Sequence, residues 1–253
     1  MSVSRAVAVA VAARAAAAGA VGVLLLTAVG AGAAGADDNG IADKSAQAIA
    51  DASRAAMSAT TSMHMVAEVT DPTGTTALDL RFDVQGNCVG TVTPAGGSGH
   101  ADIIKRGTDV WMKLDDALLR AQVPGGAAED AIALINGRYL HGTTGSVMLR
   151  DFAEFCDLDT YKKDFASKPV GERLAKGSRT TVDGRPAITV TSRHDGETTT
   201  FQVSTEDKPY LLRLQGAGTG DDDRKQAVFS DFDEPVRAVP PKPADSVDLS
   251  KLQ

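Results

Sequence analysis

The sequence predicts an α+β fold, in which a curved antiparallel sheet carries helices on its concave face. Three observations lead to this prediction. Several short segments alternate apolar and polar residues, Asp-Gly pairs that favour tight hairpins interrupt extended runs, and segments of helical periodicity lie at the start and middle of the chain. Strands joined by tight turns pair antiparallel, and their single apolar face needs a cover that the helices supply.

The chain opens with an apolar segment typical of a targeting sequence. Arg5 and Arg14 give a positive beginning, residues 15–36 carry no charge, and Ala34-Gly35-Ala36 offers small residues before Asp37. We expect residues 1–36 to be a signal peptide of an exported protein, placed in the envelope or outside the cell. The alternative is a retained membrane anchor, because 22 uncharged residues just suffice to span a bilayer.

The rest of the chain is expected to form one domain, residues 37–236, followed by a proline-rich tail, residues 237–253. The whole chain of 253 residues has a formal net charge of −7, and its only two basic residues before Asp37 would leave with the leader. An acidic surface repels phosphates, which argues against nucleic acid as a partner.

The first elements change from helical to strand periodicity. Residues 41–59 are predicted to form a helix, with Ile41 and Ile49 on a modest apolar stripe. Residues 75–84 then alternate cleanly, which indicates a strand with one dry and one wet face. Weaker strands are expected at residues 63–69, 88–92 and 109–114.

The middle of the chain is expected to be helical and the last part extended. Helices are predicted over residues 127–135, 146–156 and 157–166, the second with Ser146 as its N-cap. The pairs Asp183-Gly184 and Asp195-Gly196 predict hairpins. The further strands fall at residues 180–190, 192–203, 210–215 and 224–232.

The two cysteines, Cys88 and Cys156, are expected to form a disulfide, because an exported chain with an even cysteine count meets oxidising conditions. Two buried free thiols are the alternative. A zinc site is not predicted, since two isolated cysteines lack the spacing of metal ligands.

No pattern in the chain predicts catalysis, a metal or a cofactor. The four histidines include no metal-binding pair, and the sequence around His100 departs from a nucleophile elbow. The pair Asp115-Asp116, like Asp157 and Asp159, is more typical of helix caps and turns than of an acid/base pair. The acidic run 221–223 lacks calcium-loop spacing and is expected to be a solvated turn.

The dry face of the predicted sheet is the candidate ligand-binding surface. It can be filled by side chains or left partly open for an acyl chain, and periodicity does not separate the two. The residues that alternation places on this face form three rows: Leu78, Leu80, Phe82 and Val84; Val110, Met112 and Leu114; Leu212 and Leu214.

Several segments together resemble the LppX/LprG family of actinobacterial lipoproteins, part of the wider group of LolA/LolB-like lipid carriers. They are the helix at 41–59, "TTSMHMVAEV" at 60–69, "DVWMKL" at 109–114, the Asp-Gly hairpins and "FSDFDEPVRAVPP" at 229–241. The resemblance implies a half-barrel that binds diacyl or triacyl lipids between sheet and helices and moves them to the outer envelope. It implies no catalytic residues. Val29 stands where these lipoproteins carry their lipid-modified cysteine.

The sequence therefore predicts a non-enzymatic envelope or secreted protein that binds lipid or another apolar ligand. A membrane surface or an export partner is the further partner class that this function implies. Two alternatives stay open: a cell-surface scaffold protein with a filled core, and a hydrolase of unrecognised type.

Overall fold

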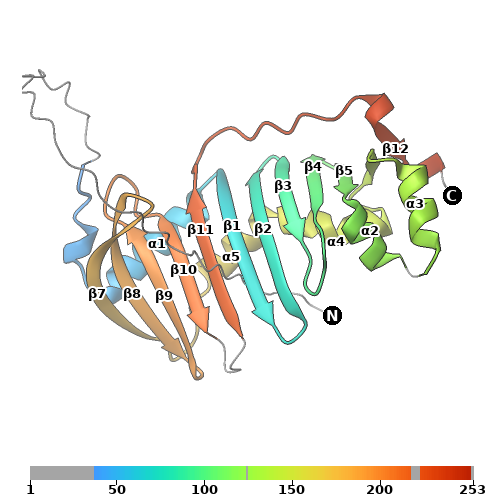
Figure 1. Cartoon of the computed structure of the whole chain (residues 1–253). Coiled ribbons are helices and arrows are strands. Elements are labelled where there is room, and N and C mark those ends of the chain that lie inside the picture. The colour runs from blue at the N-terminus through green and yellow to red at the C-terminus, as the bar shows by residue number, and fades with distance from the viewer. Residues whose placement is uncertain (1–36, 124, 218–222, 252–253) are drawn as a thin grey trace, which may run out of the picture.

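A single curved sheet with helices on its concave face forms the molecule (Figure 1). The structure is a computed structural model that describes residues 37–123, 125–217 and 223–251. The predicted signal peptide and the acidic residues Asp221 and Asp222 lie outside the described residues. The described part contains twelve strands and five α-helices, with four short 3-10 turns.

The strands follow the chain in two groups around a helical insert. They are β1 Ser62–Asp71, β2 Gly74–Asp83, β3 Cys88–Thr93, β4 Ala101–Arg106, β5 Asp109–Leu114, β6 Tyr139–Thr143, β7 Arg173–Val182, β8 Arg185–His194, β9 Glu197–Ser204, β10 Leu211–Ala217, β11 Arg224–Ser230 and β12 Ser246–Asp248.

The sheet is continuous because the last long strand returns to the first. Its order is β12-β6-β5-β4-β3-β2-β1-β11-β10-β9-β8-β7, with β11 antiparallel to β1. Neighbouring strands of the described chain pair antiparallel except β12 and β6, which run parallel. The tail after β11 passes along one end of the strands before it adds β12 at the far edge (Figure 1). The segment predicted as a proline-rich tail thus contributes a strand, β12, and two 3-10 turns, Pro243–Asp245 and Leu249–Lys251.

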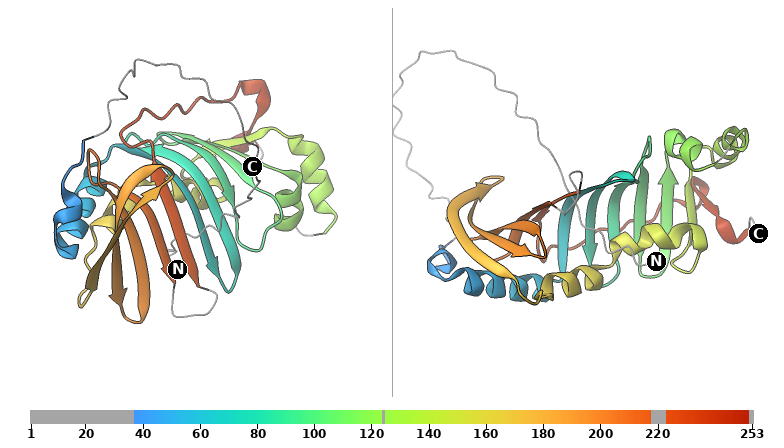
Figure 2. Two further views of the ribbon diagram at one scale, coloured as in Figure 1. Left: turned by 60° about the vertical axis from the view of Figure 1, so that its left-hand side comes forward. Right: turned by 90° about the horizontal axis from the view of Figure 1, so that it is seen from below.

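Three helices cover the concave face in a row. They are α1 Ala46–Ala59, α5 Leu158–Ala166 and α4 Val147–Ala153, which lie nearly end to end along the sheet (Figure 2). The ammonium of Lys162 in α5 donates a hydrogen bond to the carbonyl of Thr60, just after α1, at 3.1 Å. This contact joins the end of one helix to the next. The other helices, α2 Asp116–Gln122 and α3 Ala127–Ile135, lie beyond β5 at the end of the sheet (Figure 1).

Because side chains alternate along a strand, every second one packs against these helices. Leu80 and Phe82 of β2 and Val110 of β5 are fully buried, and Leu212 of β10 is nearly so. Phe82 also stacks on Tyr161 of α5, with ring centroids 5.2 Å apart. The core therefore lies between the inner sheet face and the helical row, as the sequence predicts.

The Asp-Gly hairpins are confirmed. Asp183 and Gly184 join β7 to β8 with φ angles of 49° and 85°, and Asp195 and Gly196 join β8 to β9 with 48° and 83°. Two consecutive residues with positive φ form the turn whose twist matches that of paired strands. Local chemistry alone determines both turns.

The first helix begins later than predicted. Residues Ile41–Asp43 form a 3-10 turn, Lys44 is extended, and Ser45 caps α1 by accepting a hydrogen bond from the Ala48 amide at 3.2 Å. A serine at this position satisfies an amide that the first helical turn leaves free. The apolar side chain of Ile41 is nevertheless buried, in a cluster with Ile49 and β8 residues.

The helical insert differs in detail from its prediction. The segment predicted as the helix 146–156 is α4 followed by a 3-10 turn, Glu154–Cys156, and Asp157 then caps α5. Ser146 does precede α4, but its hydroxyl accepts from the Thr143 amide at 3.1 Å and not from the helix. Asp115, predicted as a cap, accepts from the Leu118 amide at 2.7 Å at the start of α2.

The disulfide between Cys88 and Cys156 is formed, with a Cα–Cα distance of 5.7 Å. It joins β3 to the break between α4 and α5, so it ties the sheet to the helical row. Both cysteines are buried, at 0% and 1% exposure. The bridge therefore fixes where the helices cross the first group of strands.

Asp233 connects three parts of the chain at the end of β11. Its carboxylate accepts hydrogen bonds from the hydroxyl of Thr60 at 3.1 Å, the amide of Thr61 at 2.8 Å, the ammonium of Lys208 at 2.8 Å and the hydroxyl of Tyr210 at 2.6 Å. Burial alone would raise the pKa of Asp233, but these donors outweigh it and hold the pKa well below its usual range.

We expect the double substitution Cys88→Ser and Cys156→Ser to lower the free energy of unfolding by about 4 kcal/mol, because a long loop regains freedom in the unfolded chain. The two cysteines are 68 positions apart. Urea unfolding followed by circular dichroism measures the change. An unfolding midpoint equal to that of the wild type would show that the bridge does not constrain the unfolded chain.

We expect Asp233→Asn to lower the free energy of unfolding by about 1–2 kcal/mol at pH 7, since hydrogen bonds to a charged acceptor are lost. Asparagine tolerates the left-handed backbone of this position, where φ is 62°. A carboxylate whose folded pKa is lowered stabilises the fold above its unfolded pKa, near 3.8. The difference between variant and wild type should therefore be complete at neutral pH and shrink as the pH falls below 4; a pH-independent difference would contradict this.

Candidate functional site

A cavity of about 280 Å³ lies between the helices and the second group of strands. We call it the α1–β9 cavity; its wall includes α1, the segment 164–172 at the end of α5 and after it, and strands β8, β9 and β10. The apolar part of the lining consists of Ala50, Met57, Phe165, Pro169, Val190, Phe201, Val203, Leu211 and Leu214. This volume is near the lower end of known ligand sites, about 300–1,000 Å³.

Every second residue of strands β8 and β9 points into this cavity and forms its sheet side. Val190, Ser192 and His194 of β8 point to the same side, as do Thr199, Phe201 and Val203 of β9. The β10 strand adds Leu211 and Leu214, which share a side because the register shifts between Leu211 and Arg213. A bulge of this kind re-aims side chains locally.

A paired charge borders the cavity. The guanidinium of Arg54 in α1 contacts the carboxylate of Glu172 at 2.6 Å and that of Asp51 at 3.3 Å. The other carboxylate oxygen of Glu172 accepts from the Ser192 hydroxyl at 2.8 Å. Arg54 and Glu172 have side-chain exposures of only 13% and 9%, so they are held in place and largely withdrawn from water.

The sequence-predicted lining residues fall in three places. Leu214 lies in the wall of the α1–β9 cavity. Seven others are buried in the core between sheet and helices: Leu78, Leu80, Phe82, Val110, Met112, Leu114 and Leu212.

Val84 does not continue the inward row of its strand. β2 ends at Asp83, whose carboxylate accepts from the amides of Gln85 and Asn87 and so turns the chain. Val84 is consequently 47% exposed. The local turn overrides the alternation that places it with Phe82.

The sequence analysis missed the charged and aromatic parts of the cavity. Phe201, Ser192 and Thr199 lie in predicted strands, and alternation counted outward from the Asp195-Gly196 turn would have placed them on one face. Arg54 and Glu172 carry no such signal, because they meet only in the folded chain, 118 positions apart.

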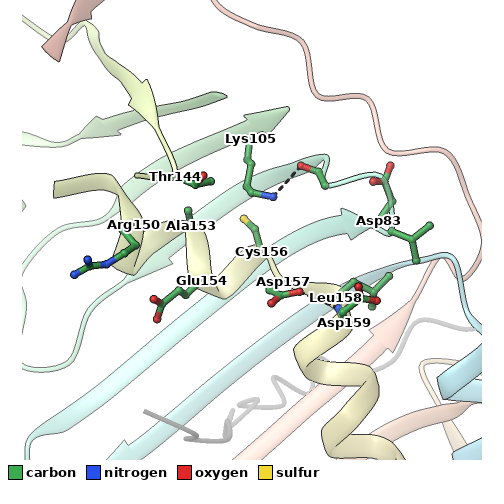
Figure 3. A pocket seen from close by; sticks show the side chains of 12 residues that line it. Asp83, Lys105, Thr144, Arg150, Ala153, Glu154, Cys156, Asp157, Leu158 and Asp159 are labelled. Atoms are coloured by element: carbon green, nitrogen blue, oxygen red, sulfur yellow. Dashed lines mark hydrogen bonds between the residues drawn. The ribbon is translucent and has the colours of Figure 1, made fainter. Parts of the chain in front are cut away.

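A second hollow of about 290 Å³ lies beside the disulfide (Figure 3). Its charged lining residues are Asp83, Lys105, Arg150, Glu154, Asp157 and Asp159, and Arg150 lies on the side of Ala153 and Glu154. The ammonium of Lys105 donates to the carbonyl of Gly86 at 3.1 Å. Burial lowers the pKa of Lys105, although the nearby carboxylates of Asp157 and Asp83 act in the opposite direction. Its many charged groups make this hollow a poor site for an acyl chain.

Each of the four histidines lies beside an aspartate, and His194 is also part of the lining of the α1–β9 cavity. His64 has Nδ1 3.2 Å from the Ser230 hydroxyl and Nε2 2.7 Å from Asp79. This chain of a serine, a histidine and an aspartate lines neither of the two hollows described above. In the described ranges, no cluster of three or more histidine, cysteine, aspartate or glutamate side chains is arranged to hold a metal ion.

The described helices are all too short or too polar to cross a membrane.

Known structures share the fold of this chain. No protein-family model matches the sequence, and no curated protein is similar to it in sequence. The crystal structure of LprF from Mycobacterium bovis matches with a TM-score of 0.52 and 15% identity, over 78% of this chain and 96% of LprF. The Mycobacterium tuberculosis lipoprotein LppX matches with a TM-score of 0.45 and 15% identity, over 80% of this chain and all of LppX.

The likeness to LprF covers nearly all of that protein, and at 15% identity it is a likeness of fold. The curved sheet with helices on its concave face agrees with the half-barrel that the sequence resemblance implies. The chain therefore shares the fold of LprF, a curved sheet with helices on its concave face.

Proposed function

We propose that this protein is a non-enzymatic, exported binding protein whose α1–β9 cavity holds a lipid acyl chain. The observation that carries the proposal is the cavity itself: its apolar wall, from Met57 and Phe165 to Phe201 and Leu214, faces a space that the helices leave unfilled. An apolar chain that enters this space gains roughly 0.8 kcal/mol for each methylene removed from water.

The resemblance to the LppX/LprG family and the likeness to the fold of LprF support this proposal. A chain of eight to ten carbons would gain about 6–8 kcal/mol, which exceeds the lower estimates of the cost of association, about 4 kcal/mol. Transfer of lipid within the envelope, with a membrane surface or an export partner, is the role in which a reversible binder of this kind would serve.

The alternative is a scaffold protein with a filled core. It is favoured by the seven predicted lining residues that pack between sheet and helices, among them Leu80 and Met112. A filled core over most of the sheet is compatible with binding at one end, so a measurement of ligand binding in the α1–β9 cavity separates the two functions.

We expect Ala50→Phe to reduce uptake of a fluorescent long-chain acyl probe at least tenfold. Ala50 is 8% exposed on the cavity side of α1, and a phenyl ring there would occupy the space that the chain needs. The matched control is Ala55→Phe, the same change on the exposed side of the same helix. Circular dichroism checks that both variants fold.

Equal uptake by the two variants, or no uptake by the wild type, would favour the scaffold function. Mass spectrometry of the protein purified from its host provides a second measurement, because a carrier should retain lipid that a filled scaffold lacks.

Export leads to a separate prediction. We propose that residues 1–36 are removed, so that the protein from the host begins at Asp37, since Ala34-Gly35-Ala36 precedes it and Val29 provides no thiol for lipid attachment. Val29→Cys should convert release into lipid anchoring. N-terminal sequencing and fractionation of culture fluid and membranes measure both; a wild-type protein found only in membranes with Arg14 still present would indicate a retained anchor.

A further inference from the structure

The wall of the α1–β9 cavity changes from apolar to polar in steps along β8 and β9. Val190 faces Phe201 across the two strands, Ser192 faces Thr199, and His194 faces Glu197. All six side chains line the cavity. Successive inward residues are about 6.8 Å apart along a strand. An apolar pair, a pair of hydroxyl residues and a histidine–glutamate pair therefore follow each other toward the β8–β9 turn.

The polar end is also the end nearer to water. The side chains of His194 and Glu197 are 33% and 45% exposed, whereas Val190 and Val203 are fully buried. A ligand that fits this gradient has an apolar chain at the Val203 end and a polar head at the level of Ser192 and Thr199. Such a gradient suits an amphiphile whose apolar tail lies in the cavity and whose polar head lies at the opening.

The charges at the polar end are already balanced within the protein. Arg54 is held between Glu172 and Asp51, the carboxylate of Glu197 lies 3.6 Å from the ammonium of Lys225, and His194 is next to Asp195. Among the described lining residues, Arg54 is the one lysine or arginine. Lys168 pairs with Asp51 at 2.6 Å, so the cations Arg54 and Lys168 balance the carboxylates of Asp51 and Glu172. A carboxylate or phosphate head would therefore add an unmatched negative charge and find no free cation there.

Hydroxyl groups suit the same place. Ser192 and Thr199 carry hydroxyls that both donate and accept, and Glu172 accepts. A ligand hydroxyl can exchange hydrogen bonds with them without adding charge to a partly buried site.

The volume limits the number of chains. At about 280 Å³ the cavity lies near the lower end of the range of known ligand sites, about 300–1,000 Å³. This size favours a ligand with one chain of medium length over a ligand with two chains.

Resting on the proposed function, we infer that the ligand of the α1–β9 cavity is a single-chain lipid with an uncharged head group that bears hydroxyls. A monoacylglycerol is the simplest lipid of this class. The head lies beside Ser192, Thr199 and Glu172, and the chain extends toward Val203 and Leu211.

Three probes of equal chain length test this inference: 1-monodecanoylglycerol, decanoate and 1,2-didecanoylglycerol, each titrated at pH 8 and measured by calorimetry and native mass spectrometry. We expect the wild type to bind one monodecanoylglycerol at least tenfold more tightly than decanoate, which is about 1.4 kcal/mol. Didecanoylglycerol should bind more weakly still.

The variant Glu172→Gln gives the sharper result. It removes the negative charge that offsets Arg54 but keeps a side chain that can hydrogen-bond Ser192. Decanoate should then bind about tenfold more tightly than to the wild type, while monodecanoylglycerol changes little. Glu129→Gln is the control, because Glu129 forms an exposed ion pair with Arg120 outside the cavity, so the same change of charge is made away from the ligand.

Thr199→Val removes one hydroxyl from the Ser192–Thr199 pair. It should weaken the binding of monodecanoylglycerol severalfold and leave the binding of decanoate unchanged. Thr200→Val, on the other face of β9, is its control.

Several results would overturn the inference while the proposed function stands. They are decanoate bound as tightly as monodecanoylglycerol by the wild type, didecanoylglycerol bound equally well, or no response of decanoate to Glu172→Gln. If the wild type bound none of the three probes and also excluded the fluorescent acyl probe, the inference and the proposed function would fail together.

Discussion

The structure depends on covering one apolar face of a twelve-stranded open sheet. Alternation puts half of the strand side chains on that face. Without a cover these side chains would stay in water, and the free energy gained by burying apolar surface, which drives folding, would be lost. Of the helices in the described ranges, α1, α5 and α4 lie along the concave face, so each must be held in place (Figure 2). The Cys88–Cys156 bridge holds the α4–α5 junction on β3, and the Asp233 carboxylate joins the end of β11 to the start of β1.

The same arrangement explains why the cavity lies at one end. Close to the disulfide, Phe82 stacks on Tyr161 and the inward rows of β2 and β5 pack tightly against the helices. Farther along, α1 and the segment after α5 cover β8 to β10 partly through the Arg54–Glu172 pair, whose charged groups need polar partners. An unfilled volume remains where the cover changes from apolar packing to polar contacts.

The electrostatics of this cavity bear on what it would bind. Family resemblance implies diacyl or triacyl lipids, whereas the volume of the α1–β9 cavity and its balanced charges favour one chain and an uncharged head. Under the proposed function, the fold would set where a lipid enters, while a few side chains at the edge of the cavity, such as Glu172 and Ser192, would determine its class.

The sequence alone determined the features that arise within a few residues: the two Asp-Gly turns, the alternation of Leu78, Leu80 and Phe82, and the helix caps Asp115 and Asp157. It left β4, β6, α2 and β12 unassigned, because these short segments are stabilised by neighbours distant in the sequence, such as the pairing of β12 with β6. The start of α1 and the exposure of Val84 were decided by a cap and a turn that compete with periodicity. Only the tertiary structure showed that most of the dry face is filled and that the cavity lies beside Arg54 and Glu172, since packing and long-range ion pairs depend on where the folded chain brings side chains together.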